Sequence, residues 1–134
     1  MAFTKVKAIG FMVKNLEEAL DHYCKAFGLP KVPIQDYPWD GVKAARVPVG
    51  DVIFDLMEPT DPEGAVGRAL ARRGEGVFLI TVALDDMEAS LKHMEDMGLS
   101  IVEGGVPPGS NRRHPFVHPK SAHGVLFELS YPDT

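Results

Sequence analysis

The sequence has very little cysteine, with only Cys24 in 134 residues. A single cysteine excludes a disulfide within the chain, and it excludes a zinc or iron–sulfur site built from several cysteines. Such cysteine usage is typical of a reducing compartment, so we expect a cytoplasmic protein. Cys24 itself lies on the apolar stripe of a predicted helix, where we expect it to pack.

Basic runs, long apolar runs and phosphate motifs are also missing. Lys and Arg form no run longer than the pairs Arg72-Arg73 and Arg112-Arg113, and the formal charge is -5. We therefore expect no nucleic-acid partner and no membrane partner. No stretch approaches the roughly 20 apolar residues that cross a bilayer, and the N-terminal residues lack the apolar run of a secretion signal, so we expect none. Gly74-Glu75-Gly76 alone is too weak a signal for a phosphate loop. A small molecule is the expected ligand.

An internal repeat organises the chain. A shift of 71 residues places 15–22 over 86–93, and a shift of 73 residues places 52–59 over 125–132. The repeat predicts two similar modules joined head to tail, within one globular domain whose composition is 45% hydrophobic and 25% charged. The predicted boundaries are module one at 1–60, a connector at 61–75 and module two at 76–134.

Each module shows the same order of periodicities. A β-type run is followed by a helical stretch and then by three shorter strand-like runs. The first helix is predicted to begin after Asn15 and end at Gly28, and the second to begin after Asp86 and end at Gly98. Each module is therefore predicted to be βαβββ, in the α+β class. The predicted strands are 6–13, 31–36, 42–48, 51–58, 77–84, 99–103, 112–118 and 124–131.

Several segments resemble one family over nearly the whole chain. The segment 9–19 is similar to its first strand and helix, while 82–87, 118–121 and the closing 124–129 are similar to its second half. This is the vicinal oxygen chelate superfamily, which includes glyoxalase I, bleomycin-resistance proteins and extradiol dioxygenases, and the chain most resembles its methylmalonyl-CoA epimerase branch. The resemblance implies an eight-stranded, incompletely closed barrel around a cavity, with helices outside, in a homodimer.

The resemblance also implies where a metal would bind. The family holds a divalent metal with one side chain from the first strand and one from the last strand of each module. The matching residues here are Ala8, Leu79, Asp55 and Glu128. Alanine and leucine have no ligand atom, so we expect no tight transition-metal site and no cofactor. Two carboxylates with waters could still hold Mg²⁺ or Mn²⁺ weakly.

Strand alternation predicts which side chains line the cavity. Residues Ile9, Phe11 and Val13 are expected to pack under the helices, and the alternate residues to face inward. Ala44 and Arg46 also point inward by this alternation. In the epimerase branch, the third strand of module one carries a glutamate taken to be a proton-transfer base. Ala44 stands at the corresponding place in this chain.

Two carboxylates in an apolar hollow suggest acid–base chemistry. Desolvation and mutual repulsion are expected to raise the pKa of at least one, which yields an acid and a base at one site. We therefore predict a metal-independent isomerisation, epimerisation or lyase step on a carbonyl or carboxylate substrate, and the resemblance adds acyl-CoA to these classes. The predicted catalytic residues are Asp55, Glu128 and Arg46; the predicted substrate contacts are Ala8, Leu79, Ala44, Trp39, His114 and Lys120.

Other interpretations of the same residues stay open. Arg46 could bind a substrate carboxylate or enolate oxygen, or it could form a buried structural ion pair with an acid. The cavity could bind or sequester a small molecule without chemistry, as in the resistance proteins. Trp39 could cover the pocket or belong to a hairpin turn. Lys120 could meet an acyl-CoA phosphate or be solvated. His114, His118 and His123 lie too far apart on a strand to chelate one ion, since four residues span about 13 Å.

Overall fold

The computed structural model describes residues 2–132. The chain divides into two compact units. The first-module unit comprises residues 8–78, and the second-module unit comprises the N-terminal residues up to Lys7 together with Leu79 onward. No helix within 2–132 has both the length and the apolar character needed to cross a membrane.

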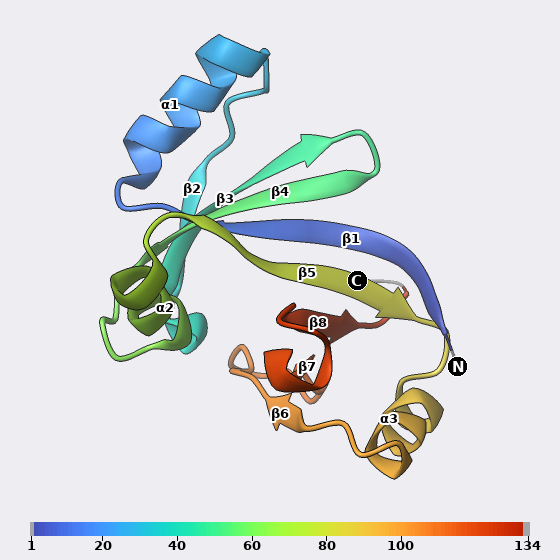
Figure 1. Ribbon diagram of the computed structural model, residues 1–134. Coiled ribbons are helices and arrows are strands. Elements are labelled where there is room, and N and C mark those ends of the chain that lie inside the picture. The colour runs from blue at the N-terminus through green and yellow to red at the C-terminus, as the bar shows by residue number, and fades with distance from the viewer. Residues whose placement is uncertain (1, 133–134) are drawn as a thin grey trace. The chain divides into compact units, whose positions relative to one another are not determined.

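The first-module unit contains four strands and two α-helices. Its strands pair in the order β2-β3-β4-β1, with β1 parallel to β4 and the other neighbours antiparallel (Figure 1). The elements are β1 (Phe3–Met12, which begins in the other unit), α1 (Leu16–Phe27), β2 (Ile34–Tyr37), the 3-10 turn η1 (Pro38–Asp40), β3 (Val42–Val49), β4 (Val52–Pro59) and α2 (Ala65–Arg73).

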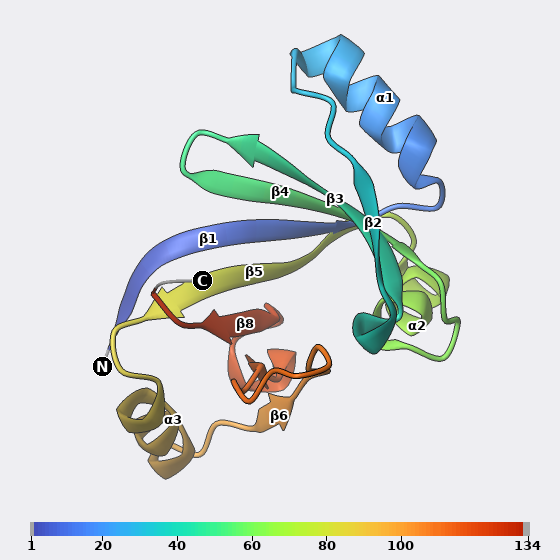
Figure 2. The same ribbon diagram turned by 180° about the vertical axis from the view of Figure 1, so that it is seen from behind.

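The second-module unit repeats this plan (Figure 2). Its strands pair in the order β5-β8-β7-β6, and the first strand is again parallel to the last. The predicted pair of βαβββ modules is therefore confirmed. The elements are β5 (Gly76–Leu84, which begins in the other unit), α3 (Met87–Asp96), β6 (Ile101–Glu103), β7 (Pro115–Val117), the 3-10 turn η2 (Pro119–Ser121) and β8 (Phe127–Ser130).

The last three strands of the second module are shorter than predicted. β7 covers three residues where 112–118 was expected, because proline stands at its start and directly after His118. A proline provides no backbone N–H for a ladder. β8 begins only at Phe127, since His123 and Gly124 both adopt positive φ in the preceding turn.

Both helices begin as predicted. The Asn15 side chain accepts a hydrogen bond from the backbone N–H of Glu18, and the Asp86 side chain accepts one from Ala89. These N-caps occupy equivalent positions in the repeat. Gly28 ends α1 in the left-handed conformation, with φ of 69°.

One face of the first-module sheet packs under α1. Leu16 and Leu20 of the helix contact Leu56 of β4, and all three are at most 2% exposed. Phe11, Val13 and Phe54 belong to the same cluster, so the predicted packing of Phe11 and Val13 under the helix is confirmed.

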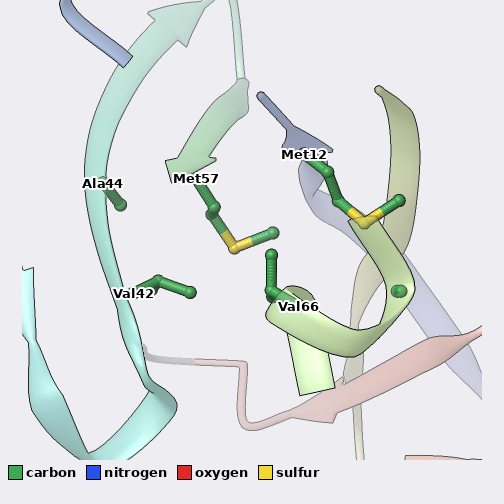
Figure 3. Packing of buried hydrophobic residues seen from close by; sticks show 6 residues of the cluster. Met12, Val42, Ala44, Met57 and Val66 are labelled. Atoms are coloured by element: carbon green, nitrogen blue, oxygen red, sulfur yellow. The ribbon is translucent and has the colours of Figure 1, made fainter. Parts of the chain in front are cut away.

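The opposite face of this sheet packs against α2. Met12, Ala44 and Met57 form a buried cluster with Val66 and Ala69 of that helix. Figure 3 shows Val66 lying between the side chains of Met12 and Met57. The connector thus covers part of the face that strand alternation assigned to the cavity.

The second-module unit has its own core. Val82 and Leu84 of β5 pack with Leu91 of α3 and Leu129 of β8. Ser90 lies in α3 at 1% exposure, and its hydroxyl has no hydrogen-bond partner within residues 2–132. A buried hydroxyl without a partner costs stability.

We predict that Ser90→Ala raises the free energy of unfolding by about 1 kcal/mol, because it removes this hydroxyl and introduces a better helix former. Urea denaturation of both proteins measures the change. Ser121→Ala is the matched control, because the Ser121 hydroxyl accepts a hydrogen bond from the Ser100 N–H at 2.8 Å. Its loss should lower stability. A destabilised Ser90→Ala variant would contradict the prediction.

Candidate active site

Glu128 lies on β8 beside Thr81 of the parallel strand β5. The Thr81 hydroxyl donates a hydrogen bond to Oε1 of Glu128 at 2.7 Å. Both residues are half-buried. The second carboxylate oxygen, Oε2, has no hydrogen bond to any other residue described here. Glu128 therefore presents one oxygen held by the protein and one with lone pairs to accept a proton.

Asp55 occupies the matching place in the first-module unit. It lies on β4 between Gly10 of β1 and Arg46 of β3. Asp55 is half-buried, with a buried Oδ1 atom. Arg46 is exposed, and the part of the chain that the structure describes offers it no ion pair. The alternative of a buried arginine ion pair is therefore wrong, because the long Arg46 side chain reaches solvent. Its role toward a substrate anion stays a prediction.

The strand registers confirm that the two acids are equivalent in the repeat. Gly10 pairs with Asp55 in one unit, and Thr81 pairs with Glu128 in the other. The same two shifts that align the sequence modules relate these pairs. Because the pairing is parallel in both units, each acid lies beside the first strand of its own module.

The first-strand positions implied for metal ligands are hydrocarbon. Ala8 is 3% exposed and Leu79 is 8% exposed. Neither side chain has a lone pair, so only Asp55 and Glu128 of the four implied positions have ligand atoms. This set does not fit the four-ligand site of the family. Within each unit, as far as it is described, no three His, Cys, Asp or Glu side chains gather as a metal cluster. Weak binding of Mg²⁺ or Mn²⁺ stays a prediction.

Ala44 lies on β3 opposite Met57 of β4, and Trp39 lies in the turn η1 that precedes β3. Ala44 is 3% exposed, within the cluster that α2 covers. Trp39 belongs to the turn η1, where its ring meets Tyr37 edge-on at 5.7 Å. The turn interpretation of Trp39 is thus confirmed, while substrate contacts of both residues remain predictions.

His114 and Lys120 flank β7 in the second-module unit. His114 is half-buried, and its carbonyl oxygen accepts the Gly104 N–H at 2.7 Å. Lys120 is exposed, and its backbone N–H donates to Nδ1 of His118 at 3.1 Å. His118 therefore stabilises this loop. Contacts of His114 and Lys120 with a ligand stay predictions.

The two arginines before His114 already have partners. Arg113 donates hydrogen bonds to both carboxylate oxygens of Glu103, at 2.6 and 3.2 Å, and these bonds raise the pKa of its guanidinium. Arg112 lies over the ring of Tyr131, at 4.5 Å from the ring centroid. These contacts hold the approach to β7 in place.

Two grooves in the first-module unit were not predicted from the sequence. One, of about 600 Å³, lies between α1 and the end of β1 and includes Phe11, His22 and Glu75 in its lining. The other, of about 460 Å³, lies beside α2 and includes Thr60 and Leu70. Neither contains a predicted site residue.

Thr81 is the site residue that sequence reasoning missed. A threonine in a strand is ordinary and gave no reason to assign a role. The signal that could have found it is the repeat, which aligns Thr81 with Gly10 beside the two equivalent acids.

Comparisons with known proteins show what this chain is similar to. Residues 8–117 match the family described as the Glyoxalase/Bleomycin resistance protein/Dioxygenase superfamily. An uncharacterized protein of Bacillus subtilis, YqjC, is 25% identical, covering 92% of this chain and 89% of its own. The mitochondrial methylmalonyl-CoA epimerase of Dictyostelium discoideum is 24% identical, covering 93% of this chain and 76% of its own.

A solved structure of similar fold has an acyl-CoA compound bound. It is a variant of methylmalonyl-CoA epimerase from Streptomyces coelicolor in complex with 2-nitronate-propionyl-CoA. It is 30% identical to this chain, covers 96% of each chain and superposes with a TM-score of 0.83. The predicted fold class is therefore confirmed over almost the entire chain.

Proposed function

Because the chain belongs to the glyoxalase/bleomycin resistance/dioxygenase superfamily, we propose that it is an epimerase-like enzyme that moves a proton at a carbon next to a carbonyl group. The step is an isomerisation, epimerisation or lyase reaction on a small carboxylate or acyl-CoA substrate. The observation that carries the proposal is the half-buried Glu128, with one oxygen held by Thr81 and the other able to accept a proton.

The charges fit such a step. A positioned carboxylate acts as a general base in proton abstraction. Asp55 is the equivalent carboxylate of the first-module unit. Arg46 is an exposed cation on the strand next to Asp55, and a guanidinium binds a carboxylate or enolate oxygen through charge-assisted hydrogen bonds.

We further propose that the reaction needs no tightly bound transition metal. The hydrocarbon side chains of Ala8 and Leu79 leave only two carboxylates of the implied ligand set, and carboxylates with waters suit Mg²⁺ or Mn²⁺ at weak affinity. A cytoplasmic homodimer, as the cysteine usage and the family resemblance imply, completes the proposal.

Hydrogen exchange with solvent tests the function directly. The protein is incubated in D₂O with methylmalonyl-CoA, with other 2-substituted acyl-CoAs and with small 2-oxo acids, with and without EDTA. Mass spectrometry of the recovered compounds measures deuterium at the carbon next to the carbonyl. We expect incorporation into at least one compound, at a rate that EDTA leaves unchanged. Loss of exchange on chelation, restored by a divalent ion, would refute metal independence.

A non-catalytic binding protein is the second candidate. The observation that favours it is Ala44, which carries no proton-transfer group and is buried among hydrocarbon side chains. Thermal shift with the same compounds separates the candidates. A compound that raises the melting temperature but is recovered without deuterium supports binding alone, whereas deuterium uptake supports the enzyme.

A further inference from the structure

The two modules surround their equivalent acids with different neighbours. Glu128 faces a hydroxyl on the adjacent first strand, whereas the residue in the same position beside Asp55 is Gly10, which has no side chain. We propose that Thr81 is a positioning residue that holds Glu128 as the proton-accepting carboxylate of the site. This inference rests on the proposed function and assigns a task within it.

The geometry of the pair is that of a strong hydrogen bond. The distance of 2.7 Å between the Thr81 hydroxyl and Oε1 of Glu128 lies in the range of an O–H donor to a carboxylate. Threonine is β-branched and therefore stiff about χ1. The parallel pairing of β5 with β8 sets the distance between the two backbones. The stiff side chain and the strand pairing together fix the position of the Thr81 hydroxyl relative to Glu128.

The pair lies on the face of the sheet away from α3. Val82 and Leu129 are core residues under that helix, and Ile80 and Phe127 pack against the same core. Since side chains alternate along a strand, Thr81 and Glu128 point to the opposite face. The core under α3 therefore forms without this hydrogen bond, so a role in packing there does not account for it.

The hydrogen bond has a chemical consequence for the carboxylate. A hydroxyl that donates to Oε1 restricts the rotation of the carboxylate group of Glu128. Oε2 then points in a fixed direction and keeps its lone pairs for the substrate proton. A base held in this way abstracts a proton without first losing rotational freedom.

Two substitutions at position 81 test the inference. Thr81→Val keeps the shape of the side chain and removes the hydroxyl, whereas Thr81→Ser keeps the hydroxyl. Steady-state deuterium exchange into the most active compound of the panel gives kcat and KM. We expect Thr81→Val to lower kcat on the order of tenfold, from the usual worth of a hydrogen bond to a charged group. KM should change little, because the hydroxyl donates its hydrogen bond to Glu128. Thr81→Ser should restore most of kcat.

A control variant and the remaining outcomes make the test decisive. Thr60→Val changes an exposed threonine outside the proposed site and should exchange at the wild-type rate. If Thr81→Val has the kcat of the wild type, the inference about Thr81 is overturned while the proposed function stands. A Thr81→Ser variant as slow as Thr81→Val would also overturn it, because the shape of the side chain would then matter rather than the hydroxyl. A wild-type protein that exchanges none of the compounds overturns the proposed function together with this inference.

Discussion

Glu128→Gln is expected to lower the rate of solvent-deuterium exchange at least about 100-fold, since a positioned general base contributes on the order of 10²–10⁴ to a rate. Glutamine has nearly the volume of glutamate, and its amide oxygen can still accept the hydrogen bond that Thr81 donates. The substitution therefore removes the basic oxygen while preserving the shape of the site. The measurement is deuterium incorporation per unit time under saturating substrate.

The control for this variant is Glu17→Gln, which changes an exposed glutamate in the first turn of α1. It should exchange at the wild-type rate. Urea denaturation checks that Glu128→Gln is folded, and we expect its midpoint to lie close to that of the wild type. A folded Glu128→Gln variant with full activity would remove Glu128 from the mechanism.

Gly67→Ala is expected to lower the free energy of unfolding by about 2 kcal/mol, although alanine is intrinsically the better helix former. Gly67 lies in α2, where an added Cβ would overlap the carbonyl oxygen of Asp61 and lie 2.9 Å from Cα of Pro62. Both atoms belong to the backbone, so no change of rotamer relieves the overlap. The helix would have to shift away from its contacts with Met12 and Met57.

The matched control for this prediction is Arg68→Ala, at the next and exposed position of α2. Its stability should stay within about 0.5 kcal/mol of the wild type, as is usual for a surface substitution. Urea denaturation gives both values. If Gly67→Ala proved as stable as the wild type or more so, helix propensity would outweigh the overlap with the backbone.

Local sequence accounts for the modules and their helices. Asn15 and Asp86 were identified as helix caps because a short polar side chain satisfies backbone N–H groups at a helix start wherever it occurs. The repeat likewise related Asp55 to Glu128, and the strand registers agree. The helix caps depend on residues within one helical turn, and the pairing of the two acids depends on the internal repeat of the sequence.

Local sequence patterns could not predict which segments that lie far apart in the chain contact one another. The apolar residues of α2 predict that one side of the helix is buried, but its partners Met12 and Met57 come from two other elements. The predicted first strand began at residue 6, whereas β1 begins at Phe3. The earlier residues are held by the second-module unit, where the Thr4 hydroxyl donates to the Ala83 carbonyl oxygen.

Periodicity and the repeat alone yielded the two βαβββ modules, their caps and the pair of equivalent acids, because each of these follows from the spacing of residues along the chain. The exposure of Arg46, the cover that α2 places on Ala44 and the hydrogen bond from Thr81 to Glu128 came from the folded chain. These three features depend on how far a side chain extends and on which segments contact one another in the folded chain. The spacing of residues along a strand specifies neither.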